Sequence, residues 1–226
     1  MKKIGLIFAL KEELEETKER IKLIQEHKIY DLTIYECKSG ENECYLLVSG
    51  MGKVNAARAT QILIDNMKVD YILNVGVAGS VSRKVGKCDI VIGDNLVQHD
   101  FDLTPLGREK GMIPNVGKFV KCDEKLIDIA KNVKSDSNVF IGNIASGDIF
   151  ITSEKDAKEI NENYNALCAE MEGAAIAQAS YLSGVPFLVI RAISDSPYEK
   201  DNNITFEEFL KISSESVSKF VVEFLK

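Results

Sequence analysis

The chain has 226 residues, of which 45% are apolar, and its formal net charge is −7. This length and apolar content suffice for one large domain with a full hydrophobic core. The negative charge argues against a nucleic-acid partner, which a basic surface would indicate, and no apolar run is long enough to cross a membrane.

Cysteine and histidine usage narrows the chemistry further. The five cysteines are scattered and form no C-x-x-C pair, so we expect free thiols in a reducing cytoplasm rather than disulfides or a zinc site. The two histidines, His27 and His99, are too few for a multi-histidine metal site. The N-terminal apolar run is short and ends at Lys11, which indicates a buried strand rather than a signal peptide.

The beginning of the chain predicts a strand followed by a helix. Residues 4–9 are continuously apolar, as in a buried strand. A charged helix is predicted from about Lys11, with Leu14, Ile21 and Ile24 on its apolar face. Two strands over 30–37 and 43–49 come next, joined by a turn that contains glycine.

A glycine-rich turn at 49–53 then leads into a helix with an apolar inner stripe. The pattern there, G-x-G-x-x-N, is a weak match to a dinucleotide-binding fingerprint, because no acid ends a second strand. A strand over 71–77 ends in the small residues Val77, Ala78 and Gly79, against which a flat ligand could lie.

The middle of the chain alternates strands with helices. Strands are predicted over 88–97 and 139–145, and helices over 123–133 and from Ser153. Between them, residues 99–117 are rich in glycine and proline and predict a long loop. A loop of this length usually serves as a lid or an interface.

The most informative stretch begins with Glu170-Met171-Glu172. A helix of small residues over 173–183 follows, and Gly184 is placed to end it in a left-handed conformation. A strand over 185–193 then leads to Asp195. Charged groups at both ends of a helix–strand unit suit a site at the carboxyl edge of a sheet.

The predicted elements define an α/β fold, a single domain over residues 1–226 with a central mixed β-sheet flanked by helices. The early pair of strands without an intervening helix indicates that part of the sheet is antiparallel. The last helix carries an apolar stripe, which consists of Phe206, Phe209, Leu210, Val217, Phe220, Val221 and Phe224.

Three acids, Glu13, Glu172 and Asp195, are predicted to share one pocket that hydrolyses purine nucleosides. Cleavage of an N-glycosidic bond needs an acid for the leaving base, a base for water and a group that holds the ribose hydroxyls. We assign Asp195 as the acid, with a pKa raised by burial, Glu13 as the base, and Glu172 as the ribose ligand. Helix-terminal or capping roles for these acids stay open, as does a structural ion pair for Arg191.

Several short motifs occur in a fixed order along nearly the whole chain. They are IGLI at 4–7, EE at 12–13, SGMGKV at 49–54, VAG at 77–79, SGD at 146–148, EMEGAA at 170–175, RAISD at 191–195 and FEEFL at 206–210. In this order they resemble the 5′-methylthioadenosine/S-adenosylhomocysteine nucleosidases of the nucleoside phosphorylase superfamily.

The resemblance implies a nucleoside phosphorylase-like fold and hydrolysis of 5′-methylthioadenosine and S-adenosylhomocysteine, with release of adenine. It implies that Glu13 activates water, Asp195 protonates adenine N7 and Glu172 binds ribose hydroxyls. Arg191 and Ser194 would support the water and the acid. The remaining implied contacts are adenine stacking on Phe150, backbone contacts from Ile151, Met171 beneath the sugar, and Met51 and Phe206 in the pocket for the 5′-alkylthio group.

The resemblance also implies a homodimer in which the loop around Leu106 and Pro114 reaches into the partner's site, and it implies no metal or organic cofactor. Two positions depart from the family pattern: Val77 stands where many members have serine, and Leu106 where an aromatic residue is common. The Val-Ala-Gly-Ser form at 77–80 is similar to members that also cleave 6-amino-6-deoxyfutalosine.

Two rival functions remain to be weighed. A phosphate-dependent purine nucleoside phosphorylase would need arginines, or a serine–arginine pair, around its phosphate. Here the first strand leads to Lys11-Glu12-Glu13, and Asn74 and Val77 occupy the end of the next strand. A non-catalytic binding protein on the same fold would be expected to lack one of the three acids, and all are present. The sequence therefore favours hydrolysis.

Overall fold

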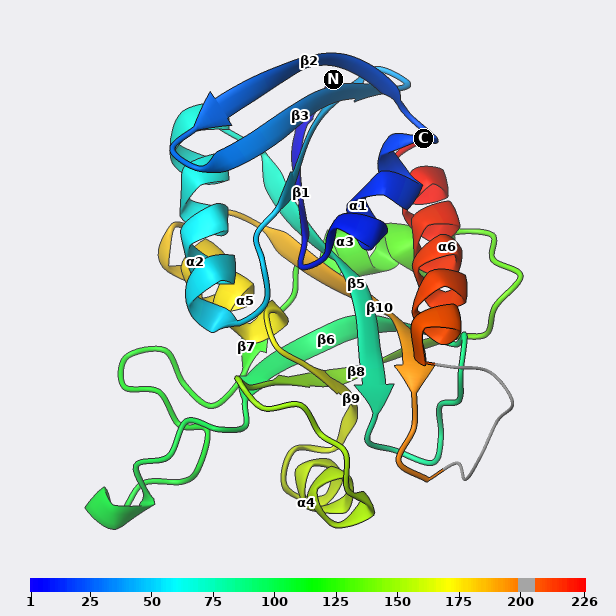
Figure 1. Cartoon of the computed structure of the whole chain (residues 1–226). Helices are drawn as coiled ribbons and strands as arrows, with labels where there is room; N and C mark the ends of the chain where they lie inside the picture. Colours follow the sequence, from blue (N-terminus) through cyan, green and yellow to red (C-terminus); the bar gives the residue numbers. More distant parts are fainter. Residues whose placement is uncertain (199–205) are drawn as a thin grey trace.

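The computed structural model describes residues 1–198 and 206–226, with the backbone alone described for residues 206–209. One mixed sheet runs through the molecule, with helices on both of its faces (Figure 1). The strands are β1 (Lys3–Phe8), β2 (Lys22–Ile29), β3 (Leu32–Ser39), β4 (Asn42–Val48), β5 (Tyr71–Ser80), β6 (Ile90–Gln98), β7 (Val120–Lys121), β8 (Val139–Ser146), β9 (Ala166–Glu170) and β10 (Phe187–Asp195). The helices are α1 (Lys11–Lys18), α2 (Lys53–Ile62), α3 (Glu124–Ala130), α4 (Glu154–Tyr164), α5 (Gly173–Leu182) and α6 (Phe206–Phe224).

Strand β5 lies at the junction of two parts of the sheet. On one side, β5, β10, β6, β8 and β9 pair in sequence, and β9 returns to β5, so these strands close into a ring. On the other side, β1, β4, β3 and β2 extend the sheet as an open edge. Strands β1, β4, β5 and β10 run parallel to one another, and β2–β3–β4 form antiparallel pairs. The predicted mixed α/β sheet is confirmed.

Helix pairs cover the two faces of the parallel part of the sheet. Helices α2 and α5 pack against each other on one side, and α1 and α6 pack on the other, where α6 lies along β10 (Figure 1). Helix α5 consists largely of small residues, and its Ala174, Ala175 and Ala177 are buried, which suits close packing against neighbouring elements. Strand β1, continuously apolar from Ile4 to Phe8, is fully buried between these layers.

The prediction of a helix from about Lys11 with Ile21 and Ile24 on its apolar face is wrong beyond Lys18. Helix α1 ends there, and β2 pairs antiparallel with β3 at the open edge of the sheet. Tyr30, with a φ of 55°, forms the tight turn that joins them. Ile24 is 49% exposed, so its helical spacing did not reflect a buried face. Pairing with β3 outweighs the local helical pattern.

Two short strands, β7 and β9, were not predicted, whereas the long loop was. Residues 99–117 are largely irregular, apart from a short 3₁₀ turn at Thr104–Leu106, and this segment projects away from the sheet (Figure 1). Within the part of the chain that the structure describes, no helix is long and apolar enough to cross a membrane.

The end of α5 has the conformation predicted for Gly184. Its φ is 68°, and the N–H of Val185 donates to the carbonyl of Ser180 at 2.9 Å, which closes the last turn of the helix. A Cβ atom at this position would meet no atom within 4 Å, so only the backbone conformation constrains the residue.

We expect Gly184→Ala to lower the free energy of unfolding by about 1 kcal/mol, because the left-handed conformation disfavours a Cβ atom. Gly184→Asn should lower the free energy of unfolding by clearly less, since asparagine tolerates this conformation. Urea unfolding of the three proteins measures the difference. An alanine variant as stable as the parent would show that this backbone strain does not govern stability.

Candidate active site

A cavity of about 310 Å³ opens where the parallel strands β1, β5 and β10 reach their carboxyl ends. This is the edge at which open α/β sheets bind ligands. The structure brings the three predicted acids together here, since Glu13, Glu172 and Asp195 all line the cavity. The other predicted site residues in its lining are Met51, Val77, Ala78, Gly79, Phe150, Ile151, Met171 and Ser194.

Glu13 is held by backbone groups at the junction of β1 and β5. Its side chain is buried, and Oε2 accepts hydrogen bonds from the N–H groups of Ala9 and Leu10, each at 3.0 Å. Its Oε1 accepts a bond from the N–H of Val77, also at 3.0 Å. Burial raises the pKa of Glu13, while Arg191 and these backbone bonds act in the opposite direction. The result is one fixed orientation for the carboxyl group and an increased affinity for a proton.

Two glycines of β5 make room for the acids. A Cβ atom at Gly76 would lie 2.6 Å from Glu13 Oε1 and 2.9 Å from Arg191 Nη1. A Cβ atom at Gly79 would lie 3.0 Å from Asp195 Oδ2. The bare backbone of β5 therefore forms the floor on which both carboxyl groups lie.

Asp195 is the last residue of β10. Strand β10 pairs with one edge of β5, and β1, which leads to Glu13, pairs with the other edge. The hydroxyl of Ser194 donates to Asp195 Oδ1 at 2.7 Å, which orients the carboxyl group. Burial raises the pKa of Asp195, and the bond from Ser194 and the charge of Lys87 partly oppose this. A raised pKa is the property that the sequence led us to expect of a proton donor.

Glu172 stands at the N-terminus of α5 and reaches across to the loop before α2. Its Oε1 accepts a hydrogen bond from the N–H of Gly52 at 2.8 Å, and its side chain is buried. Burial and the nearby charge of Glu170 raise the pKa of Glu172 to about 7, against the attraction of Arg191. Glu172 can thus change its charge near neutral pH.

Arg191 lies outside the cavity lining and forms a buried ion pair, as in the structural role that the sequence left open for it. Its Nη2 donates to Glu170 Oε2 and to Asn74 Oδ1, and it lies 3.8 Å from Glu172 Oε2. Asn74 in turn donates to the carbonyl of Ile7 at 3.0 Å. The guanidinium thereby connects β10, β5 and β1 at the level of the acids.

Sequence reasoning assigned no role to Glu170, which is the main ion-pair partner of Arg191. Its carboxylate also accepts bonds from the hydroxyl of Ser146 and, at 2.7 Å, from the N–H of Gly173 at the start of α5. An acid at the end of an apolar strand and just before a helix was the available signal. Ala9, Leu10, Ile149, Ala169 and Leu210 also line the cavity but carry no chemical signal in the sequence.

Besides Arg191, three predicted site residues do not appear in the cavity lining. Leu106 is 74% exposed and Pro114 is exposed too, both on the projecting loop. Phe206 begins α6, but its side chain lies outside the described residues. Among the residues that are described, no group of three or more histidine, cysteine, aspartate or glutamate side chains is arranged to hold a metal ion.

Comparison with known protein families identifies the class of protein to which this fold and its carboxylate-lined cavity belong. The family profile of the phosphorylase superfamily matches residues 3–226, so the chain belongs to that superfamily.

Individual relatives narrow the assignment. A 5′-methylthioadenosine/S-adenosylhomocysteine nucleosidase of Haemophilus influenzae is 40% identical over 227 residues, which cover 99% of this chain and 98% of the relative. The structure of S-adenosylhomocysteine nucleosidase from Streptococcus pyogenes, in complex with 5-methylthiotubericidin, has a TM-score of 0.92 at 36% identity and covers 99% and 96% of the two chains. Futalosine hydrolase of Helicobacter pylori has a TM-score of 0.92 at 30% identity, with 99% and 97% coverage.

The chain therefore belongs to the 5′-methylthioadenosine/S-adenosylhomocysteine nucleosidase family. This membership confirms the prediction of an enzyme, a hydrolase of the N-glycosidase class.

The raised pKa of Glu172 makes stability depend on pH. Its value in the folded protein, about 7, lies above the ordinary 4.5, so the protonated form stabilises the fold. That contribution is fully present below about pH 4.5 and is lost as the pH rises through 7. Between these pH values we expect Glu172→Gln to reduce the slope of the free energy of unfolding against pH by on the order of 1 kcal/mol per pH unit.

Urea unfolding at several pH values between 4.5 and 8 measures this effect. Glu12→Gln, which changes an exposed acid of the same helix turn as Glu13, is the matched control and should keep the parental profile. Identical slopes in the parent and in Glu172→Gln would contradict the burial-raised pKa.

Proposed function

We propose that the chain hydrolyses the N-glycosidic bond of 5′-methylthioadenosine and S-adenosylhomocysteine, releasing adenine and the 5′-thioribose. The observation that carries this proposal is the charge of the cavity. Its described lining contains the carboxyl groups of Glu13, Glu170, Glu172 and Asp195 and neither lysine nor arginine. Such a lining suits a neutral nucleoside and a water molecule, and it suits a transition state that gains positive charge on the sugar.

Asp195 is the proposed general acid. Adenine leaves as a poor anion unless N7 is protonated, so the donor must retain its proton near neutral pH. Burial raises the pKa of Asp195, and Ser194 fixes the orientation of its carboxyl group. Phe150, 59% exposed at the cavity, offers a face on which the adenine ring can stack, with backbone contacts from Ile151.

Glu13 is the proposed general base. A carboxylate has about four lone-pair positions, and the N–H groups of Ala9, Leu10 and Val77 occupy three of them. The remaining position can accept a proton from water. The contact from Val77 uses its backbone, so the absence of a serine hydroxyl at 77 leaves this support of Glu13 intact. Arg191 acts on the base from behind, through its charge.

Glu172 is the proposed ribose ligand. Its ionised form would accept bonds from the ribose hydroxyls and stabilise positive charge on the sugar. Because its pKa is raised to about 7, substrate binding should strengthen as Glu172 ionises. Met171 would lie beneath the sugar, and Met51 with Phe206 would contact the 5′-alkylthio group.

A second candidate substrate is 6-amino-6-deoxyfutalosine. The Val-Ala-Gly-Ser sequence at 77–80 and the likeness to a futalosine hydrolase favour it. The same three acids would perform the same bond cleavage. Phosphorolysis is disfavoured by the carboxylate lining, because Glu13 would repel a phosphate ion at the position proposed for water.

Adenine release from 5′-methylthioadenosine should be equally fast with and without phosphate, and should yield free methylthioribose. Asp195→Asn, which cannot donate a proton, should lower kcat by about 10²-fold or more. Glu13→Gln should do the same through loss of the base. A requirement for phosphate would make the chain a phosphorylase, and release from aminodeoxyfutalosine alone would favour the second candidate.

The proposal includes a homodimer in which the loop around Leu106 and Pro114 completes the partner's site. The exposure of Leu106 and Pro114 and the projection of their loop from the sheet support it (Figure 1). Sedimentation should give a dimer at assay concentrations, and Leu106→Asp should raise KM by about tenfold by weakening contact with the 5′ substituent. A fully active monomer would contradict a shared site.

A further inference from the structure

Two loops form facing parts of the cavity rim. The loop before α2 brings Met51 to the cavity and uses the N–H of Gly52 to hold Glu172. The segment after β8 brings Ile149 and Phe150 to the same cavity. The relative position of these loops therefore sets both the width of the binding cavity and the support of Glu172.

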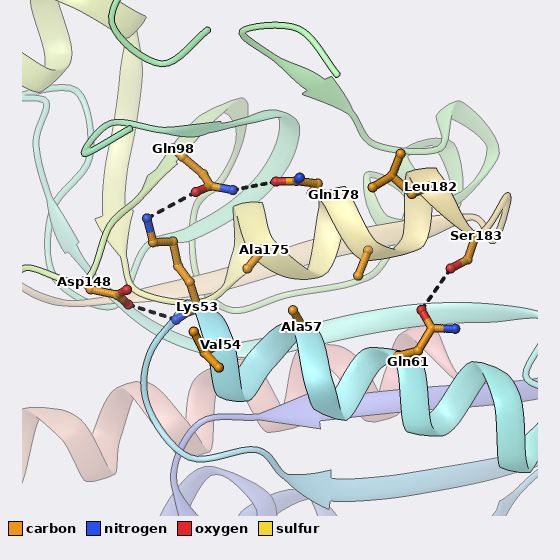
Figure 2. Close-up of a pocket in the computed structure, with 11 residues that line it drawn as sticks. Lys53, Val54, Ala57, Gln61, Gln98, Asp148, Ala175, Gln178, Leu182 and Ser183 are labelled. Atoms are coloured by element: carbon orange, nitrogen blue, oxygen red, sulfur yellow. Dashed lines mark hydrogen bonds between the residues drawn. The ribbon is translucent and has the colours of Figure 1, made fainter. Parts of the chain in front are cut away.

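Asp148 joins the two loops directly. Its Oδ1 accepts a hydrogen bond from the N–H of Lys53 at 2.8 Å, at the first turn of α2 (Figure 2). The approach is close, because a Cβ atom on Gly52 would lie 3.0 Å from the same oxygen. A carboxylate at this end of a helix is also favoured by the helix dipole.

Lys53 closes this contact into a ring. Its Nζ donates to Asp100 Oδ1 at 2.6 Å, and Asp100 Oδ2 accepts a bond from the N–H of Asp148 at 2.9 Å. Lys53, Asp100 and Asp148 thus each bond to the other two. We call these three residues the rim ring. The side chains of Lys53 and Asp100 are only 18% and 15% exposed, so the pair is shielded from water.

The rim ring is also anchored to α5. Lys53 Nζ donates to Gln98 Oε1 at 3.1 Å, and Gln98 Nε2 donates to Gln178 Oε1 at 2.8 Å (Figure 2). Burial alone would raise the pKa of Asp100, but its bonds from Lys53 and Asp148 outweigh this and lower the pKa. The bond from Lys53 thus favours the ionised form of Asp100, which accepts both hydrogen bonds of the ring.

We propose that Lys53 is a positioning residue that acts through Asp100 and Asp148 to hold the two rim loops at a fixed separation. Lys53 does not line the cavity, so its effect on a bound nucleoside must be indirect. Loss of its ammonium group leaves the shielded carboxylate of Asp100 without a cation. We expect this carboxylate to move toward solvent and to lose its hydrogen bond from the N–H of Asp148. Only the expected change in KM rests on the proposed nucleosidase function; the positioning of the two loops does not depend on it.

The test compares Lys53→Met, Asp100→Asn and the double variant with the parent. We expect each single variant to raise KM for the nucleoside about tenfold with a smaller change in kcat, because the loops contact the substrate while the acids stay in place. The KM of the double variant should be no higher than that of the poorer single variant, because the two residues belong to one hydrogen-bond network and their effects should not add. Lys121→Met, which removes an exposed lysine paired with Glu124, is the matched control and should leave KM unchanged.

Hydrogen exchange in the substrate-free protein gives a readout that needs no activity. The amides of Lys53 and Asp148, and the segment 147–151, should exchange at least tenfold faster in Lys53→Met, while β1 and β5 stay protected. Unchanged exchange, additive kinetic losses, or faster exchange without a rise in KM would each overturn the proposal. If the parent releases no adenine, the proposed function fails, and exchange still decides whether the rim ring holds the loops.

Discussion

The buried guanidinium of Arg191 is the interaction on which the arrangement of the site depends. It lies in β10 and meets Glu170 at the end of β9, Asn74 on β5 and, at longer range, Glu172. Removing one partner of such a buried pair typically costs about 3–5 kcal/mol, because the other charge is left without compensation. One side chain therefore links β10, β9 and β5 beside the cavity that the acids line.

The charge balance around Arg191 explains how carboxyl groups can coexist in a small cavity. One cation faces Glu13, Glu170 and Glu172, so full ionisation of all three acids is electrostatically unfavourable. The direct ion pair keeps Glu170 in the structural role. Burial raises the pKa values of Glu13 and Glu172, and both carboxyl groups line the cavity. Glu170 thus has a structural partner in Arg191, whereas Glu13 and Glu172 are acids for which we propose a role toward the ligand.

The sequence was sufficient to predict most of the parallel sheet and the meeting of the three acids. Buried parallel strands read as continuous apolar runs, and acids just beyond their ends must gather at one edge. Strand β2 was mistaken for helix because an edge strand buries little, so no alternation marked it. Glu170 was missed as the partner of Arg191 because an ion pair between distant elements leaves no local pattern. The role of Gly76 depends on a close approach that only coordinates reveal.

The pairing of β10 with both β5 and β6 has a consequence for the order of folding. The ring of strands cannot close until β10, near the end of the chain, inserts between strands made much earlier. Contacts of such high sequence separation form slowly, and a growing chain on the ribosome must wait for them. Because β10 also carries Arg191 and Asp195, a nascent chain that lacks it holds neither the acid nor the cation that places Glu170. The cavity therefore cannot take its shape before β10 has paired with β5 and β6, which precede it in the sequence.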